Sequence, residues 1–384
     1  MPEALGRDRS RIQFLDGLRG LAILLVICFH AYARYPDLMP FGNRYADIFV
    51  FRHGGIGVQL FFLISGFVIF LTLEKSRGFF DFMTRRWLRL FPAMLICSLI
   101  VYVFFSFIAE NAHRSVSLRS LLPGLSFIEP HVWQAVLRSP QTMLEGSFWS
   151  LFVEVRFYAF AGALYFLVGE TGAIAGIILM FVVTVAYASL QHLLPGGNWR
   201  IFEIYKGWTS AEHFGWFAAG ALYFRYFQTR VRQLFIMATL LAVLAAVTTG
   251  GALPGKTCAA LLVVFLFASV VHHSRLHQLL GNRVFLFLGA ISYPLYLLHE
   301  NIMVHMILKL GKLAPQIPGV LLPLLPIAGV IVIGAAVAIY VEPWLTDVIR
   351  PCYKRARLLL HIDQWRMPLA PVAEDLKPPP APLP

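Results

Sequence analysis

Hydrophobic residues in this chain gather into long runs, separated by shorter segments that carry most of the charges. A helix needs about 20 apolar residues to cross a bilayer. Runs that approach this length lie at roughly 14–34, 55–73, 88–109, 147–168, 172–190, 211–226, 233–250, 256–272, 284–308 and 320–342. The pattern predicts an all-α polytopic membrane protein with about ten transmembrane helices.

The composition agrees with a membrane protein and excludes other classes. Of all residues, 58% are hydrophobic and 14% charged, with a mean hydropathy of +0.70, whereas soluble domains are about half apolar and a quarter charged. The net charge of +12 does not come from a basic stripe interleaved with stacking aromatics, so nucleic acid is not an expected partner. The four cysteines show no metal-ligand spacing, so no metal is expected.

The distribution of lysine and arginine predicts how the chain lies in the membrane. With the N-terminus inside, the inside segments hold 19 of the 32 basic residues and the outside loops hold 11, while Arg19 and Arg156 fall within spans. Because basic residues favour the cytoplasmic side, we expect both termini to be cytoplasmic. Residues 11–345 form the predicted transmembrane domain. Residues 346–384 form a basic tail whose proline-rich end is expected to be disordered.

The longest predicted outside loop, at about 110–146, contains three prolines and several aromatic residues. Loops of this length are usually functional or mobile. The loop either forms part of an acceptor site or is a partly ordered cap, and the sequence does not separate these readings.

The first apolar run carries two ionisable residues, Arg19 and His30. Eleven positions turn a helix by three full turns and about 20°, so both side chains lie on one face, about 16 Å apart along the axis. Ionisable residues inside a membrane span are costly and usually functional. This run therefore predicts a functional path with a fixed cation at one end and a titratable base at the other.

Further segments place polar groups within apolar runs in a recognisable order. The chain contains LDGLRGLAILLVICFH, GVQLFFLISGFVIF, RRWLRLFP, FWSLFVEVRFYAF and LGAISYPLYLLHE. Together they resemble the membrane-bound acyltransferase 3 family over about residues 11–345. The resemblance includes the Arg-x10-His pattern on Arg19 and His30, the Trp-Ser-Leu-x-Val-Glu segment and the Ser-Tyr-x-Leu-Tyr-x-x-His segment. One departure is Arg156, an additional cation two positions after Glu154, where the family commonly has Glu-Glu-Gln-Phe-Tyr.

The resemblance implies an enzyme that moves an acyl group, often acetyl, from coenzyme A to a hydroxyl of a carbohydrate-type acceptor. It implies acyl-CoA, most often acetyl-CoA, as the donor and a carbohydrate or glycolipid as the acceptor. It also implies residence in the inner (plasma) membrane of a bacterium.

The predicted spans divide the ionisable residues by depth. Counting along each helix predicts an outer group of His30, Glu154 and His299 and a cytoplasmic group that includes Arg19, Arg86 and Arg89. Arginines bind phosphates through paired hydrogen bonds, so the cytoplasmic group is expected to hold coenzyme A.

Histidine is suited to general-base work near neutral pH, which makes His30 the expected base. His30 can instead carry the acyl group. Glu154 is expected either to orient His30 or to bind acceptor hydroxyls, and His299 joins the same cluster. The sequence does not separate direct from two-step transfer.

A second class of protein fits the same residues. Intramembrane arginine, glutamate and histidine also mark transport pathways, so a secondary transporter or flippase for a lipid-linked or acyl-bearing solute is the alternative. The chain has no internal repeat of the kind common in such transporters, and this disfavours the alternative.

Overall fold

The computed structural model describes residues 2–108, 117–194 and 196–359. In these ranges the chain forms helices and connecting loops without any strand, as the hydrophobic pattern predicts. The proline-rich end of the predicted tail, residue 109 at the end of a predicted span and residues 110–116 of the predicted outside loop lie outside the described residues. The beginning of the tail continues a helix that ends at Leu359.

The longer helices are α1 (Pro2–Tyr32), α3 (Gly57–Glu74), α4 (Phe79–Val103), α7 (Trp149–Leu193), α9 (Phe214–Thr229), α10 (Arg232–Gly250), α11 (Pro254–His272), α15 (Asn301–Leu313), α16 (Leu324–Ala336) and α17 (Glu342–Leu359). Shorter helices connect them: α2 (Phe49–His53), α5 (Leu121–Ser126), α6 (Pro130–Leu137), α8 (Arg200–Thr209), α12 (Leu276–Leu280), α13 (Arg283–Ala290) and α14 (Ser292–Leu298). The single turns include η1 (Gly54–Ile56), η4 (Gly146–Phe148) and η5 (Ala211–His213).

Seven helical stretches of the described chain are long and apolar enough to cross a bilayer. They are Gln13–Tyr32, Phe49–Glu74, Phe79–Phe107, Gly146–Leu193, Arg232–Gly250, Pro254–His272 and Leu324–Ile349. The number differs from ten for three reasons. Helix α7 contains two predicted spans, α9 has 16 residues, and the predicted span 284–308 is divided among α13, α14 and α15. The count of ten and the side of the termini stay predictions.

The division inside α7 has a local cause. Gly169 has φ 77° and ψ 179°, a backbone conformation outside the helical region. Residues with a side chain rarely adopt this positive φ, whereas glycine does so without a steric penalty. The glycine therefore separates two helical segments that the hydrophobic pattern already placed on either side of it.

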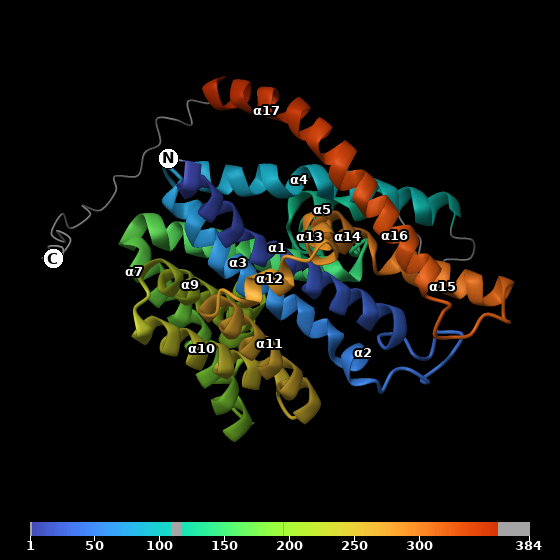
Figure 1. Cartoon of the computed structure of the whole chain (residues 1–384), viewed down its shortest axis with the longest axis horizontal. Helices are drawn as coiled ribbons and strands as arrows, with labels where there is room; N and C mark the ends of the chain where they lie inside the picture. The colour runs from blue at the N-terminus through green and yellow to red at the C-terminus, as the bar shows by residue number, and fades with distance from the viewer. Residues whose placement is uncertain (1, 109–116, 195, 360–384) are drawn as a thin grey trace, which may run out of the picture.

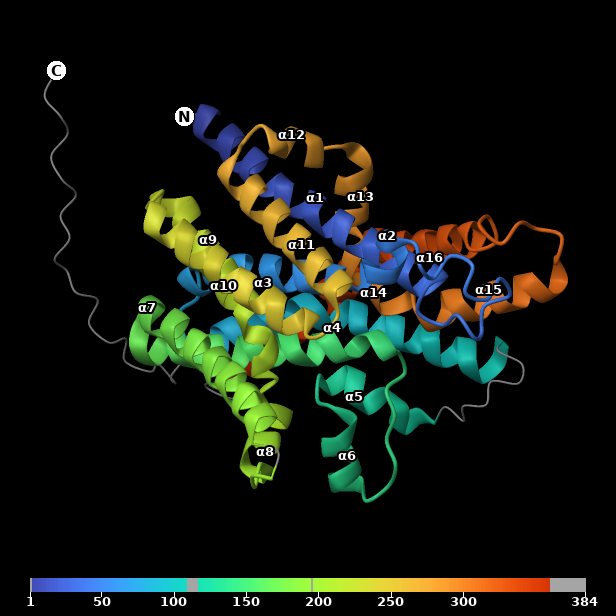
Figure 2. The same cartoon turned by 90° about the horizontal axis from the view of Figure 1, so that it is seen from below.

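Helices α1 and α3 lie side by side through the middle of the molecule, with α9, α10 and α11 on one flank and α14 and α16 toward the other (Figure 1). In the turned view, α5, α6 and α8 project beyond the long helices on one side (Figure 2). The pair α3 and α9 packs closely because small residues face each other. A Cβ on Gly66 would lie 2.0 Å from the Phe217 carbonyl oxygen, and one on Gly220 would lie 2.2 Å from that of Leu63. This central packing holds α1, with Arg19 and His30, between the other elements.

Candidate active site

The structure brings His30 and His299 into contact. His30 lies near the end of α1 and His299 directly follows α14. Nδ1 of His30 is 3.2 Å from Nε2 of His299, and the two rings are nearly perpendicular with centroids 4.7 Å apart. His299 is fully buried. The two predicted histidines thus belong to one site, although they lie far apart in the sequence.

The hydrogen-bond partners of the two rings determine where their protons lie. Nδ1 of His299 is 2.8 Å from the Tyr296 carbonyl oxygen, and Nδ1 of His30 is 2.9 Å from that of Val26. A carbonyl oxygen only accepts, so each neutral ring carries its hydrogen on Nδ1. His299 Nε2 then faces the His30 Nδ1–H as an acceptor. Nε2 of neutral His30 carries a lone pair and is the basic atom of the site.

Glu300 is the carboxylate beside this basic nitrogen. Its Oε1 is 3.7 Å from His30 Nε2 and accepts a hydrogen bond from the Tyr35 hydroxyl at 2.5 Å. Its Oε2 has no hydrogen-bond partner among the described residues, and the residue is 4% exposed. Glu300 is not among the site residues predicted from the sequence. The signal was present, since a glutamate beside a histidine in an apolar run is costly unless it is used.

Tyr35 completes this group from the segment that follows α1. Burial and then the hydrogen bond to Glu300 raise the pKa of Tyr35. A tyrosine with a raised pKa stays neutral and remains a hydrogen-bond donor. The carboxylate of Glu300 is therefore held by a neutral hydroxyl, and no arginine or lysine of the described chain forms an ion pair with it.

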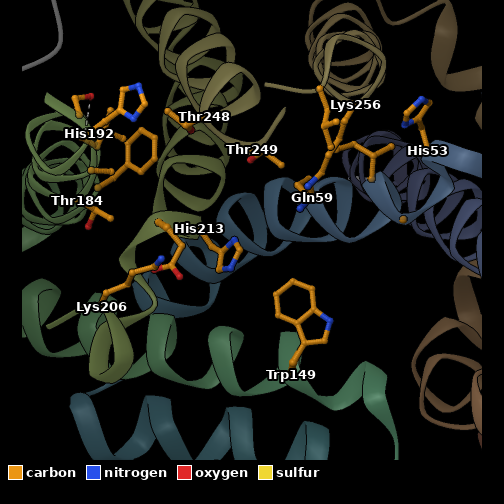
Figure 3. A pocket seen from close by; sticks show the side chains of 18 of the residues that line it. His53, Gln59, Trp149, Thr184, His192, Lys206, His213, Thr248, Thr249 and Lys256 are labelled. Atoms are coloured by element: carbon orange, nitrogen blue, oxygen red, sulfur yellow. Dashed lines mark hydrogen bonds between the residues drawn. The ribbon is translucent and has the colours of Figure 1, made fainter. Parts of the chain in front are cut away.

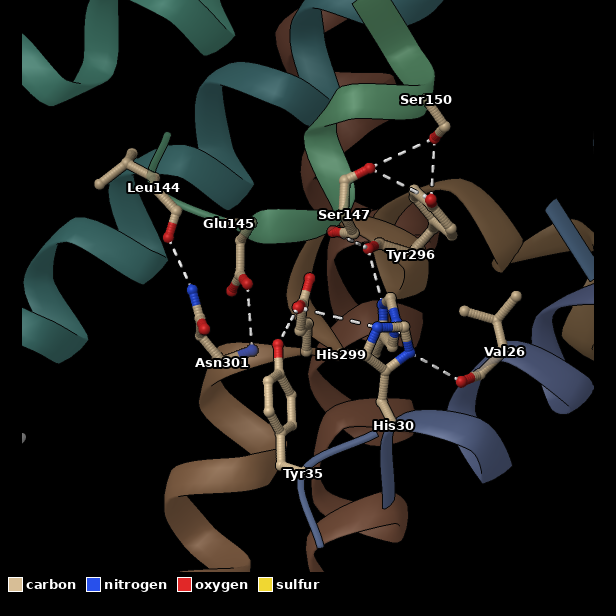
Figure 4. A network of polar contacts seen from close by, with 11 residues as sticks. Val26, His30, Tyr35, Leu144, Glu145, Ser147, Ser150, Tyr296, His299 and Asn301 are labelled. Atoms are coloured by element: carbon tan, nitrogen blue, oxygen red, sulfur yellow. Dashed lines mark hydrogen bonds and ion pairs between the residues drawn. The ribbon is translucent and has the colours of Figure 1, made fainter. Parts of the chain in front are cut away.

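A second buried carboxylate, Glu145, has a structural position at the same end of the molecule. Its Oε2 accepts from the backbone N–H of Asn301, the first residue of α15, at 3.0 Å. The Asn301 side chain donates to the Leu144 carbonyl oxygen at 2.7 Å. A carboxylate at a helix N-terminus satisfies a free backbone donor and is stabilised by the helix dipole. Glu145 thereby ties the segment before α7 to α15 (Figure 4).

Glu154 lies with the arginines and not with the histidines. Its Oε1 accepts from Ser65 at 2.6 Å and from the Tyr158 hydroxyl at 2.5 Å. The Tyr158 hydroxyl in turn accepts from Arg86 Nη2 at 2.7 Å. The predicted contact between Glu154 and His30 is therefore replaced by one between Glu300 and His30. The physical reason is that α3 and α4 supply donors and a positive charge, which a buried carboxylate requires.

Arg19, Arg86 and Arg89 line one cavity of about 320 Å³, as their predicted common depth implies. Arg19 Nη1 is 2.8 Å from Asp16 Oδ1, and Arg89 Nη1 is 3.1 Å from Glu342 Oε1. Arg89 also lines an adjacent open cavity of about 780 Å³, together with Arg85. Each of these arginines retains further N–H donors, because a guanidinium has five. The cluster is therefore suited to binding anions.

The 320 Å³ cavity extends from the arginines toward the histidine pair. Ser150 and Tyr296 also line it, and their hydroxyl oxygens are 2.8 Å apart. The ring of Tyr296 lies 5.3 Å from that of His299, between centroids. The cavity thus runs from the arginines to Tyr296, and the contact between the rings of Tyr296 and His299 connects its lining to the histidine site.

Arg156, the departure from the family pattern, has two partners in the structure. Its Nη1 is 2.9 Å from Glu129 Oε1 and donates to Ser210 Oγ at 2.5 Å. Glu129 Oε2 is also 2.9 Å from His131 Nδ1. Arg156 therefore attaches the segment at the start of α6 to α7 and does not enter either cluster.

Comparison with known proteins identifies the class. A family model described as an acyltransferase domain matches residues 12–341. The chain belongs to this family, acyltransferase 3, and its helical domain is an acyltransferase domain. The chain is also similar to an O-acetyl transferase of Shigella phage Sf6, with 29% identity over 174 residues, 44% of this chain and 50% of that protein. The match thus spans half the length of that relative. No solved structure matches the chain.

Proposed function

We propose that the protein transfers an acyl group, in the first instance acetyl, from acyl-CoA to a hydroxyl of a carbohydrate-type acceptor. The observation that carries this proposal is the cavity that three arginines share with Tyr296, whose ring packs against that of His299 beside His30. Family membership and the O-acetyl transferase relative support an O-acyl transfer. A bacterial inner membrane is the proposed location.

The donor is proposed to enter at the arginine end. Arg85 and Arg89 in the open cavity, with Arg19 and Arg86 behind them, would bind the phosphates of coenzyme A through charge-assisted hydrogen bonds. The narrower cavity, with lining that includes Val58, Phe61 and Leu90, suits the slender pantetheine arm. Its direction would present the thioester to the His30 site.

The proposed reaction uses Nε2 of His30 as the general base. The acceptor hydroxyl gives its proton to Nε2 while its oxygen attacks the thioester carbonyl carbon. The carbon–sulfur bond then breaks, and the thiolate takes the proton from the imidazolium, leaving an ester and free coenzyme A. Glu300 stabilises the transient positive ring, and His299 holds the His30 Nδ1–H, as the orienting members of a triad do.

The test is His30→Ala in purified protein with acetyl-CoA and an acceptor preparation. We expect loss of acceptor acylation by on the order of 10²-fold or more, with acetyl-CoA binding and thermal stability retained. His305→Ala on α15 is the matched control and should leave activity unchanged. Full activity of His30→Ala would exclude the assignment.

The same assay separates the enzyme from the transporter alternative. An enzyme releases free coenzyme A thiol when the acceptor is present, whereas a transporter only binds its solute. Absence of thiol release by the wild-type protein with every acceptor preparation would favour the transporter.

A further inference from the structure

A further cavity, of about 900 Å³ (Figure 3), shares no lining residue with the 320 Å³ cavity of the donor path. Its volume falls within the range of small-ligand sites. Phe29 and Trp149 are among its lining residues. The Phe29 ring lies 5.0 Å from the His30 ring, and Trp149 follows directly on η4, which contributes Ser147 to the histidine site. Through Phe29 and Trp149 the cavity therefore borders two of the elements that carry the histidine site.

A buried polar side chain of this cavity lacks a partner. Gln59 of α3 is 7% exposed and lines the cavity. Its side-chain oxygen Oε1 forms no hydrogen bond with any described residue. Leaving a buried acceptor unsatisfied costs free energy, and such groups are usually satisfied by a ligand or water. The amide oxygen is thus available to a donor such as a sugar hydroxyl.

The charges around the cavity are mainly positive. Its lining includes Lys206 of α8 and Lys256 of α11, and within the described chain neither forms an ion pair. Both lysines lie within electrostatic reach of His213, whose ring packs against Trp149 with centroids 5.4 Å apart. Two other charged residues line the cavity: Arg52, which pairs with Asp47, and Glu212.

We propose that this cavity binds the acceptor, and that the acceptor is a saccharide bearing an anionic group, either a carboxylate or a phosphate. The inference rests on the proposed function. Lys206 and Lys256 would hold the anion, Gln59 would accept from a hydroxyl, and the Trp149 indole offers an apolar surface to a sugar ring. The reacting hydroxyl would then extend past Phe29 to His30.

The test measures binding without donor, using the full-length purified protein and calorimetry. The probes are a hexuronate-containing tetrasaccharide, the same tetrasaccharide with its carboxyl groups reduced to alcohols, and a phosphorylated form of the reduced sugar. We expect the anionic probes to bind about tenfold or more tighter than the reduced one, because charge-assisted hydrogen bonds are the stronger ones. The anionic probe that binds more tightly identifies the anionic group of the acceptor as a carboxylate or a phosphate.

Variants connect this preference to the cavity. The double variant Lys206→Gln/Lys256→Gln should abolish the preference for anionic probes. Gln59→Leu should lower the binding affinity for all three probes by the same factor. Lys75→Gln, at an exposed position outside the cavity, is the charge-matched control and should bind as wild type. Thermal unfolding of each variant checks that the fold is intact.

Three outcomes would overturn the inference: no probe binds, the reduced probe binds as tightly as the anionic ones, or the double variant keeps the preference. The proposed function has a separate readout, because saccharide binding does not require acyl transfer. His30→Ala should bind the probes as wild type does. Probe binding that follows the lysines, combined with full transfer by His30→Ala, would reject the catalytic assignment and keep the acceptor site.

Discussion

The arginine cluster around Arg19 (the arginine end) and the site around His30 (the histidine end) differ in how their charges are compensated. At the arginine end, Asp16, Glu154 and Glu342 all have cationic neighbours, either directly or through Tyr158. At the histidine end, Glu300 faces a neutral tyrosine hydroxyl and His30. In a cluster where each carboxylate has a cationic neighbour, all groups stay charged, so the cluster binds an anion without any group gaining or losing a proton. A carboxylate beside a neutral imidazole stabilises a proton that arrives there, so the histidine end is the one suited to proton transfer.

The largest effect should come from removing the negative charge at the histidine end. Glu300→Gln keeps the shape and the acceptor for Tyr35 but no longer stabilises a protonated His30. We expect the turnover number to fall on the order of 10²-fold or more, while the dissociation constant for acetyl-CoA stays unchanged. Stopped-flow thiol detection and calorimetry measure the two quantities.

Glu154→Gln is the informative comparison for this result, because it also neutralises one buried carboxylate. Its expected effect is on donor binding, since the Tyr158 hydroxyl accepts from Arg86 and donates to Glu154, and so links the two side chains. If Glu154→Gln lowered turnover as much as Glu300→Gln without affecting acetyl-CoA binding, the distinction between the two ends would be wrong.

An intermediate effect is expected from the arginine end. Arg86→Met removes a guanidinium that donates to Tyr158 and lines the donor cavity. We expect KM for acetyl-CoA to rise about tenfold or more, because a charged donor to an anion is lost, with a much smaller change in turnover number. The variant should also be less stable, since it leaves Glu154 with less compensation.

A double variant separates stability from binding at this end. Arg86→Met/Glu154→Gln removes both charges and should recover much of the thermal stability lost in Arg86→Met, because replacing both members of a buried charged group is far less costly than removing one. The raised KM should persist. Recovery of KM together with stability would show that Arg86 acts on the fold and not on the donor.

The positions of the residues at the arginine end could be predicted from the sequence, whereas those at the histidine end could be predicted only in part. Arg19 and His30 lie on one regular helix, so helical periodicity alone places them on a common face, and the arginines follow from the start of α4. Glu154 was assigned by depth, but depth does not determine which neighbouring helix a side chain contacts. Glu300 was missed because the run 284–308 read as one helix. The structure breaks it into α13, α14 and α15, and the backbone at Glu300 (φ −75°, ψ −74°) lies between α14 and α15.

The smallest effect should come from Tyr35→Phe, which removes only the neutral donor to Glu300. A net hydrogen bond is worth about 1 kcal/mol, or roughly fivefold in rate. Burial and the contact with Glu300 raise the pKa of Tyr35, so the wild-type hydroxyl stays protonated and keeps donating as pH rises through its ordinary titration range. The ratio of wild-type to variant turnover should therefore stay constant from about pH 8 to about pH 11, a range in which a tyrosine with an ordinary pKa of about 10 would lose its proton. A ratio that falls toward one on the alkaline side would mean that Tyr35 loses its proton in this range, and Glu300 would then face a second negative charge instead of a neutral donor.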